Sequence, residues 1–578
     1  MSSLQNPVMP SLSRQSSGHS SQYSDSLSDL SRQSSGQSSQ HSTPSSYNSN
    51  GQGLYHKLSS RIYGNDEEKE PQALSRVSFF SFLPIDAIDE VITIDVVKAQ
   101  LPYIFDYTKA KLTLADLIKA QIPWPFSYNI PRFSEVVEQS KKILAILGLC
   151  EAEKYFWYLL SEGLTDEHLP LARITCDKCS NTLISSRGTK VTTFSNKGGN
   201  IVVENFLKKQ WQVLAPVFTT LGEDIKIEGN AALPFYDVKM ISFLNDRSTV
   251  YRGTLHAAHI MPKPKADVKI AIKDYTHQDD FDKEKDNLLK IQNLNNPHLI
   301  RHIATIQQGN LFYVIFPWAN GGNLSEFWMR PHASQARSPK LFMWCFQQML
   351  GMVDALFVLH DMNYRHGDLK PENILHFKGS SNSDARYGKY GSLVIADVGV
   401  SKVHIEATES RKKGTTTKAT TPCYEAPEAE IDDGKPRGRR YDMWSVGCIF
   451  MEFAIWLLYG YEAINGFKEL RRANDDPFPQ KAAYYRRTGK NTAEIHPIAS
   501  DGLSALKNDP RCAEGTALAD LVSLIAEDLI VIDPKKRANA KELKDKLREI
   551  LRKAEKDPGY LMRSVGPPPR IPHPFTPG

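Results

Sequence analysis

One short run of the sequence combines a carboxylate, a lysine and an amide at fixed spacing. It reads His366-Gly367-Asp368-Leu369-Lys370-Pro371-Glu372-Asn373. Asp368 would accept a hydrogen bond from a hydroxyl group and orient it for attack on phosphorus, and Lys370 would contact the phosphoryl group in transfer. Asn373, five residues after Asp368, would hold a magnesium ion against a triphosphate. The run therefore predicts transfer of a phosphoryl group to a hydroxyl.

This run is too specific to be a chance match. A string such as Asp368–Asn373 would arise by chance in roughly one chain in 10^5 of this length. It resembles the catalytic loop of eukaryotic protein kinases in its serine/threonine form, and the resemblance extends from Phe235 to Lys553. The resemblance implies an α+β, two-lobed protein kinase fold, with a small antiparallel β lobe, a helical large lobe and ATP between them. It also implies transfer of the ATP γ-phosphate to hydroxyls of a protein substrate, with Mg²⁺ as cofactor.

The resemblance also assigns the groups that hold the triphosphate. Lys273 ends the apolar segment Ile270–Lys273 and matches the lysine that binds the α- and β-phosphates. A buried lysine needs an anionic partner, and Glu284 in the next amphipathic stretch is the best candidate. Asp397 opens an Asp-Val-Gly run similar to the Asp-Phe-Gly motif of the family. Together with Asn373 it would bind magnesium through hard oxygen ligands.

The adenine site follows from the segment Phe312–Ala319, which resembles the strand and hinge of the family. A proline at position 317 offers no N–H. The family uses the carbonyl of this residue, so Pro317 would still contribute its oxygen, and Ala319 would supply the N–H. Val250 and Ala271 would pack against the two faces of the adenine ring. The resemblance therefore implies a complete ATP site.

Two further matches concern the support of the site. The run Thr421–Glu428 resembles the end of an activation segment, in which the last glutamate pairs with a distant arginine. Arg537 stands where that arginine is expected. Asp442 opens a very apolar stretch and resembles the aspartate that braces the backbone of the catalytic loop.

The sequence departs from the family at three places. The run Phe243–Val250 stands where a glycine-rich loop covers the phosphates, and it contains no glycine. Glycines let the backbone approach the phosphates closely, so we expect weaker phosphate positioning. Gly367 replaces an arginine that commonly pairs with a phosphorylated activation segment, and the side chain of the adjacent Arg365 is expected to point elsewhere. Val398 replaces a phenylalanine, which predicts a thinner hydrophobic stack beside the site.

Two functions remain open on this evidence. The set of catalytic side chains is intact, which favours an active serine/threonine protein kinase used in signalling, since this chemistry depends on positioning and on charge stabilisation. The glycine-free run favours the alternative, a pseudokinase or scaffold with weak or no phosphotransfer, because a fold does not guarantee activity.

The composition of the chain changes along its length. Residues 1–70 are rich in Ser and Gln and predict a disordered tail. Residues 71–234 predict a mainly helical domain, with strands near 201–203, whose default role is regulatory. The kinase-like pattern occupies residues 235–553, and a Pro-rich, extended tail is expected at 554–578. This helical region and the Phe-Pro-Trp-Ala hinge resemble kinases of filamentous fungi.

The overall composition favours an intracellular protein, cytoplasmic, nuclear or both. The 578 residues carry a net charge of +5, too weak to favour a nucleic-acid partner. The start of the chain lacks the pattern of a signal peptide, and no apolar run is expected to cross a membrane. The seven cysteines are unpatterned, which predicts reduced thiols. Cys176 and Cys179 have the spacing of half a zinc site, but without a second pair they are expected to be ordinary cysteines.

Overall fold

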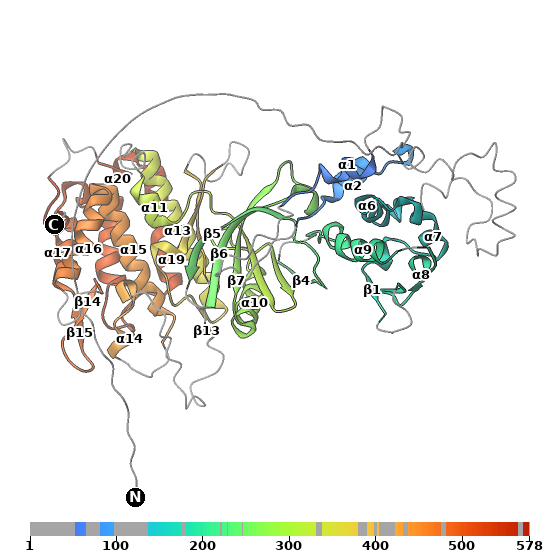
Figure 1. The fold of residues 1–578 in the computed structure, drawn as a ribbon. Helices are drawn as coiled ribbons and strands as arrows, with labels where there is room; N and C mark the ends of the chain where they lie inside the picture. The colour runs from blue at the N-terminus through green and yellow to red at the C-terminus, as the bar shows by residue number, and fades with distance from the viewer. Residues whose placement is uncertain are drawn as a thin grey trace, which may run out of the picture. The chain divides into compact units, whose positions relative to one another are not determined.

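The fold is that of a computed structural model (Figure 1). The residues that it describes are 53–64, 81–96, 137–174, 181–197, 199–219, 222–227, 229–244, 247–330, 338–379, 390–397, 402–403, 422–431, 437–474, 481–563 and 570–576. Three sequence predictions lie outside these residues: most of the Ser-rich tail, the pair Cys176 and Cys179, and the position of Val398.

A six-stranded sheet forms the small lobe, with helix α10 (Gln278–Gln292) beside it (Figure 1). The strand order is β4-β8-β9-β7-β6-β5, and all neighbours are antiparallel except β4 and β8. The bounds are β4 (Glu223–Ile227), β5 (Phe235–Leu244), β6 (Ser248–Leu255), β7 (Val268–Tyr275), β8 (Ala304–Gln308) and β9 (Leu311–Pro317). The expected small antiparallel lobe is therefore present. The sheet starts before Phe235, where the pattern placed the lobe's beginning, because β4 pairs along its whole length with β8.

Helices form the large lobe, around one continuous apolar core. They are α11 (Leu324–Met329), α13 (Pro339–Asp361), α14 (Glu428–Ile431), α15 (Arg440–Tyr459), α16 (Tyr461–Ala473), α17 (Pro497–Lys507), α18 (Ala517–Leu524), α19 (Ala540–Lys556) and α20 (Pro558–Leu561). Nineteen of the twenty residues of α15, all but Arg440, are buried, so this helix lies inside the lobe with every side covered, which explains its mainly apolar sequence. By length and composition alone α13 and α15 could cross a membrane, and both lie mostly inside the lobe.

The end of the chain packs on the large lobe where it is described. The sequence predicted an extended tail from residue 554, whereas α19 continues to Lys556 and α20 follows it. Phe575 is fully buried, with its ring centroid 5.3 Å from that of Tyr459 and 5.5 Å from that of Phe467. Burial of a phenylalanine side chain removes a large apolar surface from water, and this explains why the Pro-rich segment returns to the lobe.

The region before the sheet has a core of its own. Its elements are α1 (Leu54–Ser59), α2 (Ile85–Val91), α6 (Lys141–Leu149), α7 (Phe156–Ser161), α8 (Thr193–Lys197), α9 (Asn200–Val213) and a sheet of β1 (Leu171–Arg173), β2 (Leu183–Ser185) and β3 (Lys190–Val191). Two predictions are corrected. Residues 54–59 are helical and bury Leu54 and Leu58, so the disordered tail cannot extend to residue 70. Residues 201–203 belong to helix α9 because Val203, Phe206 and Val213 recur at helical spacing on its buried side.

A buried ion pair ties the segment before α15 to the segment before α19. The two guanidinium nitrogens of Arg537 donate to the two carboxylate oxygens of Glu428, at 2.9 and 3.1 Å. The arginine is 1% exposed and the glutamate 6%. The predicted pairing of these residues is confirmed. Further bonds from Arg537 to the carbonyls of Val531 and Arg440 satisfy its remaining donors.

We predict that Arg537→Met lowers the free energy of unfolding by about 3–5 kcal/mol, because the change leaves a buried carboxylate without its partner. Urea denaturation at neutral pH measures it. The matched control is Arg548→Met, which breaks an exposed ion pair with Asp545 and should cost less than about 1 kcal/mol. Equal effects of the two substitutions would contradict a structural role for the buried pair.

Candidate active site

The backbone of the catalytic loop is held by one buried carboxylate, that of Asp442 in the first turn of α15. Its two oxygens accept the N–H groups of His366 and Gly367, both at 2.8 Å, and His360 Nε2 lies 2.8 Å from Oδ2. The side chain is fully buried. Burial acts to raise the pKa of Asp442, but the bond from His360 and nearby positive charge hold it below its ordinary value. The predicted brace is confirmed.

Three predicted side chains meet at the start of this loop. Lys370 Nζ donates to Asp368 Oδ2 at 2.9 Å. Asn373 Nδ2 donates to the Asp368 carbonyl at 2.8 Å and to its Oδ2 at 3.2 Å. The residue Pro371 opens the short 3-10 turn that brings Asn373 back towards Asp368. The spacing of five residues therefore places the carboxylate and the amide side by side, as the sequence predicted.

A hairpin brings Asp397 to the same place. Strands β11 (Ile374–Phe377) and β12 (Ser392–Ile395) pair antiparallel directly after the loop, and the Ala396 N–H donates to the Asn373 carbonyl at 2.8 Å. His366 Nε2 lies 2.9 Å from the Ala396 carbonyl. A carbonyl only accepts, so Nε2 carries the proton and Nδ1 is free to accept the Asp368 N–H at 3.3 Å. The residue Asp397 has a positive φ of 58°, a strained conformation that is common at functional sites.

Lys273 reaches Asp397 across the cleft. Its Nζ lies 3.1 Å from Asp397 Oδ1. Burial acts to lower the pKa of Lys273, but the Asp397 and Glu284 carboxylates hold it well above its ordinary value. The same cation holds the pKa of Asp397 below its ordinary value. The pair is therefore fully ionised at neutral pH.

The predicted contact between Lys273 and Glu284 is not formed. Within the described residues the ion pair of Lys273 is with Asp397, while Glu284 lies on α10 at 5% exposure. Burial raises the pKa of Glu284, and the charge of Lys273 offsets this only in part. Lys273 pairs with the carboxylate of Asp397, which lies within hydrogen-bond distance. Glu284 raises the pKa of Lys273 only through the attraction between their charges.

The residues predicted to contact adenine lie where β7 meets β9 and β6. Ala271 of β7 pairs with Phe316 of β9, and Lys273 of β7 pairs with Val250 of β6, on the opposite edge of β7. The Trp318 N–H donates a hydrogen bond to the Lys269 carbonyl at 3.0 Å. The Ala319 N–H has no acceptor within the part of the chain that the structure describes, so it is available to a ligand. Pro317, the first residue of the predicted hinge, is the last residue of strand β9.

The glycine-free run forms the hairpin between β5 and β6. Phe243 pairs with Thr249 and Leu244 with Ser248, so the strands continue to the turn. The Ser248 side chain is 7% exposed, and the Thr276 N–H donates to the Arg247 carbonyl at 2.9 Å. The hairpin therefore forms without glycine, anchored to the end of β7.

The prediction that the Arg365 side chain points away from position 367 is wrong. A Cβ added to Gly367 would lie 3.3 Å from Arg365 Nε and 3.6 Å from its Nη2, so this guanidinium lies beside the backbone of Gly367. The signal was available, because a missing side chain at one position leaves room for a neighbouring one.

We predict that Asp442→Asn lowers the free energy of unfolding at pH 7 by about 1–3 kcal/mol, because the amide cannot accept all the bonds that the carboxylate accepts. The pKa of Asp442 is lower in the folded than in the unfolded chain. Its stabilisation is therefore complete above the unfolded value of about 3.9 and is lost as the pH falls through the folded pKa.

The measurement is urea denaturation of both chains between pH 7 and pH 3, with the exposed Asp501→Asn as control. The gap between wild type and Asp442→Asn should narrow as the pH falls. A gap that stays constant with pH would show that the charge of Asp442 is not the stabilising feature.

Comparison with known proteins is consistent with this geometry. The family model described as protein kinase domain matches residues 252–547, just over half of the chain. A probable serine/threonine-protein kinase, fhkD, of Dictyostelium discoideum is 32% identical over 28% of this chain and 20% of its own length. A calcium/calmodulin-dependent protein kinase of Metarhizium anisopliae is 28% identical over 36% of this chain and 48% of its own length. The CBL-interacting serine/threonine-protein kinase 21 of Arabidopsis thaliana is 30% identical over 32% and 39%.

The chain thus spans less than half the length of these curated relatives. The matched residues include the catalytic loop, Lys273 and Asp397, and exclude the region before the sheet. The chain belongs to the eukaryotic protein kinase family, in its serine/threonine class.

Proposed function

We propose that this chain is an active protein kinase that transfers the γ-phosphate of ATP to serine and threonine hydroxyls of a protein substrate. One observation carries the proposal. Lys273 contacts Asp397 at 3.1 Å, Ala396, the residue before Asp397, donates its N–H to the Asn373 carbonyl at 2.8 Å, and the Asn373 amide contacts Asp368 at 2.8 and 3.2 Å. Phosphoryl transfer needs little covalent chemistry from the protein and depends on groups fixed in this way.

Each side chain has a role that its surroundings support. Asp368 would accept the hydrogen bond of the substrate hydroxyl. Lys370, whose Nζ lies 2.9 Å from Asp368 Oδ2, would contact the phosphoryl group during transfer. Lys273 would bind the α- and β-phosphates, for which its cation is suited because its pKa is raised. The hinge atoms of Pro317 and Ala319 would bind adenine between Val250 and Ala271.

The acidic end of the site fits a magnesium ion. Asn373 uses its amide nitrogen on Asp368, which leaves its Oδ1 as a neutral oxygen ligand. The carboxylate of Asp397, with its lowered pKa, is a charged oxygen ligand of the kind that this ion prefers. Asn373 and Asp397 would hold the ion, which when bound neutralises charge on the triphosphate.

The alternative is a pseudokinase that binds partners without turnover. It is favoured by the hairpin without glycine between β5 and β6 and by the absence of a direct Lys273–Glu284 pair in the described residues. Both features would loosen the hold on the phosphates, and neither removes a group that takes part in the transfer.

We predict that the full chain transfers labelled γ-phosphate to a generic protein substrate, and that Asp368→Asn and Lys273→Met each reduce the rate by about 10²–10⁴-fold. Mass spectrometry should place the phosphate on serine or threonine. The control is Lys490→Met, an exposed lysine in the β14–β15 hairpin (Tyr485–Arg487 and Ala493–Ile495). If all four chains are folded and equally silent, the scaffold function is favoured instead.

We infer that the region before the sheet regulates the kinase lobe. The Ile85 N–H, at the start of α2, lies 3.3 Å from His259 Nε2 in the loop after β6, and Asp86 pairs with Lys263 at 2.9 Å. Phe82 is fully buried with Ala215 and Ala232, with its ring 5.5 Å from that of His259. The contact reaches the β6–β7 connection, and β7 carries Lys273, so it could bias the ATP site.

We predict that Phe82→Ala changes the transfer rate or the KM for ATP by about threefold or more, as expected for a substitution that couples two regions. The matched control is Phe206→Ala, also fully buried but inside the separate core of this region. Steady-state kinetics on the full chains decide the question. Unchanged kinetics in both variants would contradict a regulatory role.

We further propose an intracellular location, with protein substrates and without a nucleic-acid partner.

A further inference from the structure

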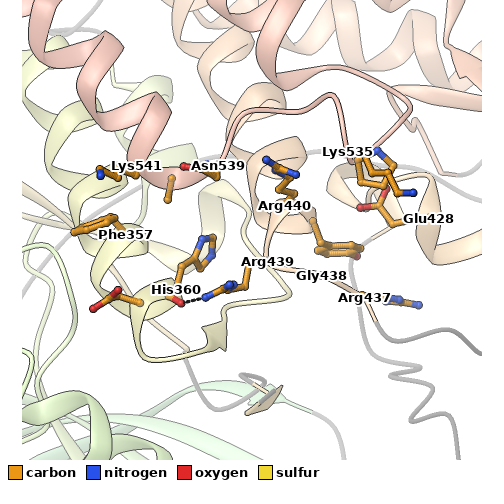
Figure 2. Close-up of a pocket in the computed structure, with 14 residues that line it drawn as sticks. Phe357, His360, Glu428, Arg437, Gly438, Arg439, Arg440, Lys535, Asn539 and Lys541 are labelled. Carbon is orange, nitrogen blue, oxygen red and sulfur yellow. Dashed lines mark hydrogen bonds between the residues drawn. The ribbon is translucent and has the colours of Figure 1, made fainter. Parts of the chain in front are cut away.

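A cavity of about 620 Å³ lies in the large lobe, where the end of α13 meets the first turns of α15 and α19 (Figure 2). A volume of this size is typical of sites that enclose a small molecule. None of the side chains assigned above to ATP, to magnesium or to phosphoryl transfer lines this cavity. It is therefore separate from the candidate active site.

Most of the charge on the wall of the cavity is positive. The cations that line it are Arg437, Arg439, Arg440, Lys535 and Lys541. Arg437 contacts Glu425, whereas the other four form no ion pair with the described residues. Of the two carboxylates in the wall, Glu428 is paired with Arg537 at 2.9 Å, and Asp361 is exposed. The cations are therefore in excess, and a concave surface with one sign of charge attracts anions.

Two donors in this wall lack an acceptor. The Tyr441 side chain is 2% exposed, and its hydroxyl has no hydrogen-bond partner within the described residues. The Nε of Arg440, the residue before it, is also buried and unpartnered there. Burial raises the pKa of Tyr441, so the hydroxyl keeps its proton at neutral pH. A buried donor is costly when it is left unsatisfied, and a ligand in the cavity would supply the missing acceptor.

The backbone of α15 favours the same kind of ligand. This helix has 20 residues, and Arg439 at its N-cap forms no capping bond through its side chain. The N–H groups of a first helical turn carry partial positive charge, which attracts anions. The end of α13 would oppose this effect through its carbonyl groups, but the carbonyl of His360 already accepts a hydrogen bond from Arg439 (Figure 2).

We propose that this cavity binds a compact, soluble molecule that carries several phosphate groups. Guanidinium forks and ammonium groups match phosphate oxygens. Arg440, the Tyr441 hydroxyl and the start of α15 would bind one phosphate, and Lys535 and Lys541 would bind another. A cavity between helix ends suits a small molecule better than an extended peptide, which needs a longer groove. The proposal does not depend on whether the chain transfers phosphate.

The test is titration calorimetry of the full chain with inositol hexakisphosphate as the probe and unphosphorylated inositol as its control. Arg440→Met and Tyr441→Phe should each weaken binding of the probe about tenfold. The double substitution Lys535→Met with Lys541→Met should do the same. Asp361→Asn should strengthen binding about threefold, because it removes the exposed carboxylate of the wall.

Three control variants should bind the probe as the parent chain does. Lys490→Met and Arg548→Met remove exposed cations elsewhere, and Lys273→Met removes the cation of the ATP site. Urea denaturation without the probe checks the fold. Tyr441→Phe should be as stable as the parent chain, because the hydroxyl that it removes has no partner in the described residues. Binding that is unchanged by Tyr441→Phe, Arg440→Met and the double lysine variant, or that is lost in Lys273→Met, would overturn the proposal.

A second arm tests the source of the phosphates, since a lipid headgroup carries the same chemistry. Sedimentation compares phosphatidylcholine vesicles with and without phosphatidylinositol 4,5-bisphosphate. We expect equal, weak binding to both, because none of the residues that line the cavity is an exposed large apolar side chain that could enter a lipid layer. Stronger binding to the phosphorylated vesicles that Tyr441→Phe abolishes would contradict a soluble ligand.

Discussion

A single buried carboxylate, that of Asp442, fixes the geometry on which the whole site depends. Desolvating a charge is costly unless its oxygens are satisfied, and here three donors satisfy them: the N–H groups of His366 and Gly367 and the His360 ring. Because α15 is buried on all sides, the carboxylate cannot move relative to the large lobe. The loop that carries Asp368 is therefore held by the core of the lobe.

Short contacts connect this loop to the sheet of the small lobe. His366 and Asn373 position Ala396, and the next residue, Asp397, meets Lys273 of the sheet. The ion pair closes the cleft with a contact that a triphosphate and its metal would have to share or replace. The positions at which this chain departs from the protein kinase pattern lie outside this series of contacts. The hairpin without glycine joins the end of β5 to the start of β6, beside the end of β7, and the guanidinium of Arg365 lies beside Gly367.

The sequence predicted those features in which one residue type at one spacing has one function. Asp368 and Asn373 belong to this class, whereas the roles of Asp442 and of the Glu428–Arg537 pair were implied by the resemblance to protein kinases. It did not predict which carboxylate Lys273 contacts, because that depends on the placement of β12 relative to α10. It misjudged Arg365 for a similar reason: the direction of a side chain follows from backbone φ and from local space, which a motif does not contain.

The boundaries of the fold were harder to predict than its chemistry. Strand β4 joins the sheet through β8, far along the chain, so local periodicity could not assign it to the kinase lobe. Helix α1 lies in a segment with polar composition, yet two leucines one turn apart suffice to pack it on α6. Phe575 does the same for the Pro-rich end of the chain. In each case a few apolar residues outweigh the average composition of their segment.

We propose that Lys273, Asn373 and Asp397 form a working nucleotide site although the hairpin between β5 and β6 lacks glycine. The most direct measurement is thermal or urea unfolding of the full chain with and without Mg-ATP. We predict that Mg-ATP at 100 times its dissociation constant stabilises the wild type by about 2.7 kcal/mol and that Lys273→Met loses most of this gain. Equal stability with and without nucleotide, at concentrations that saturate ordinary kinases, would contradict it.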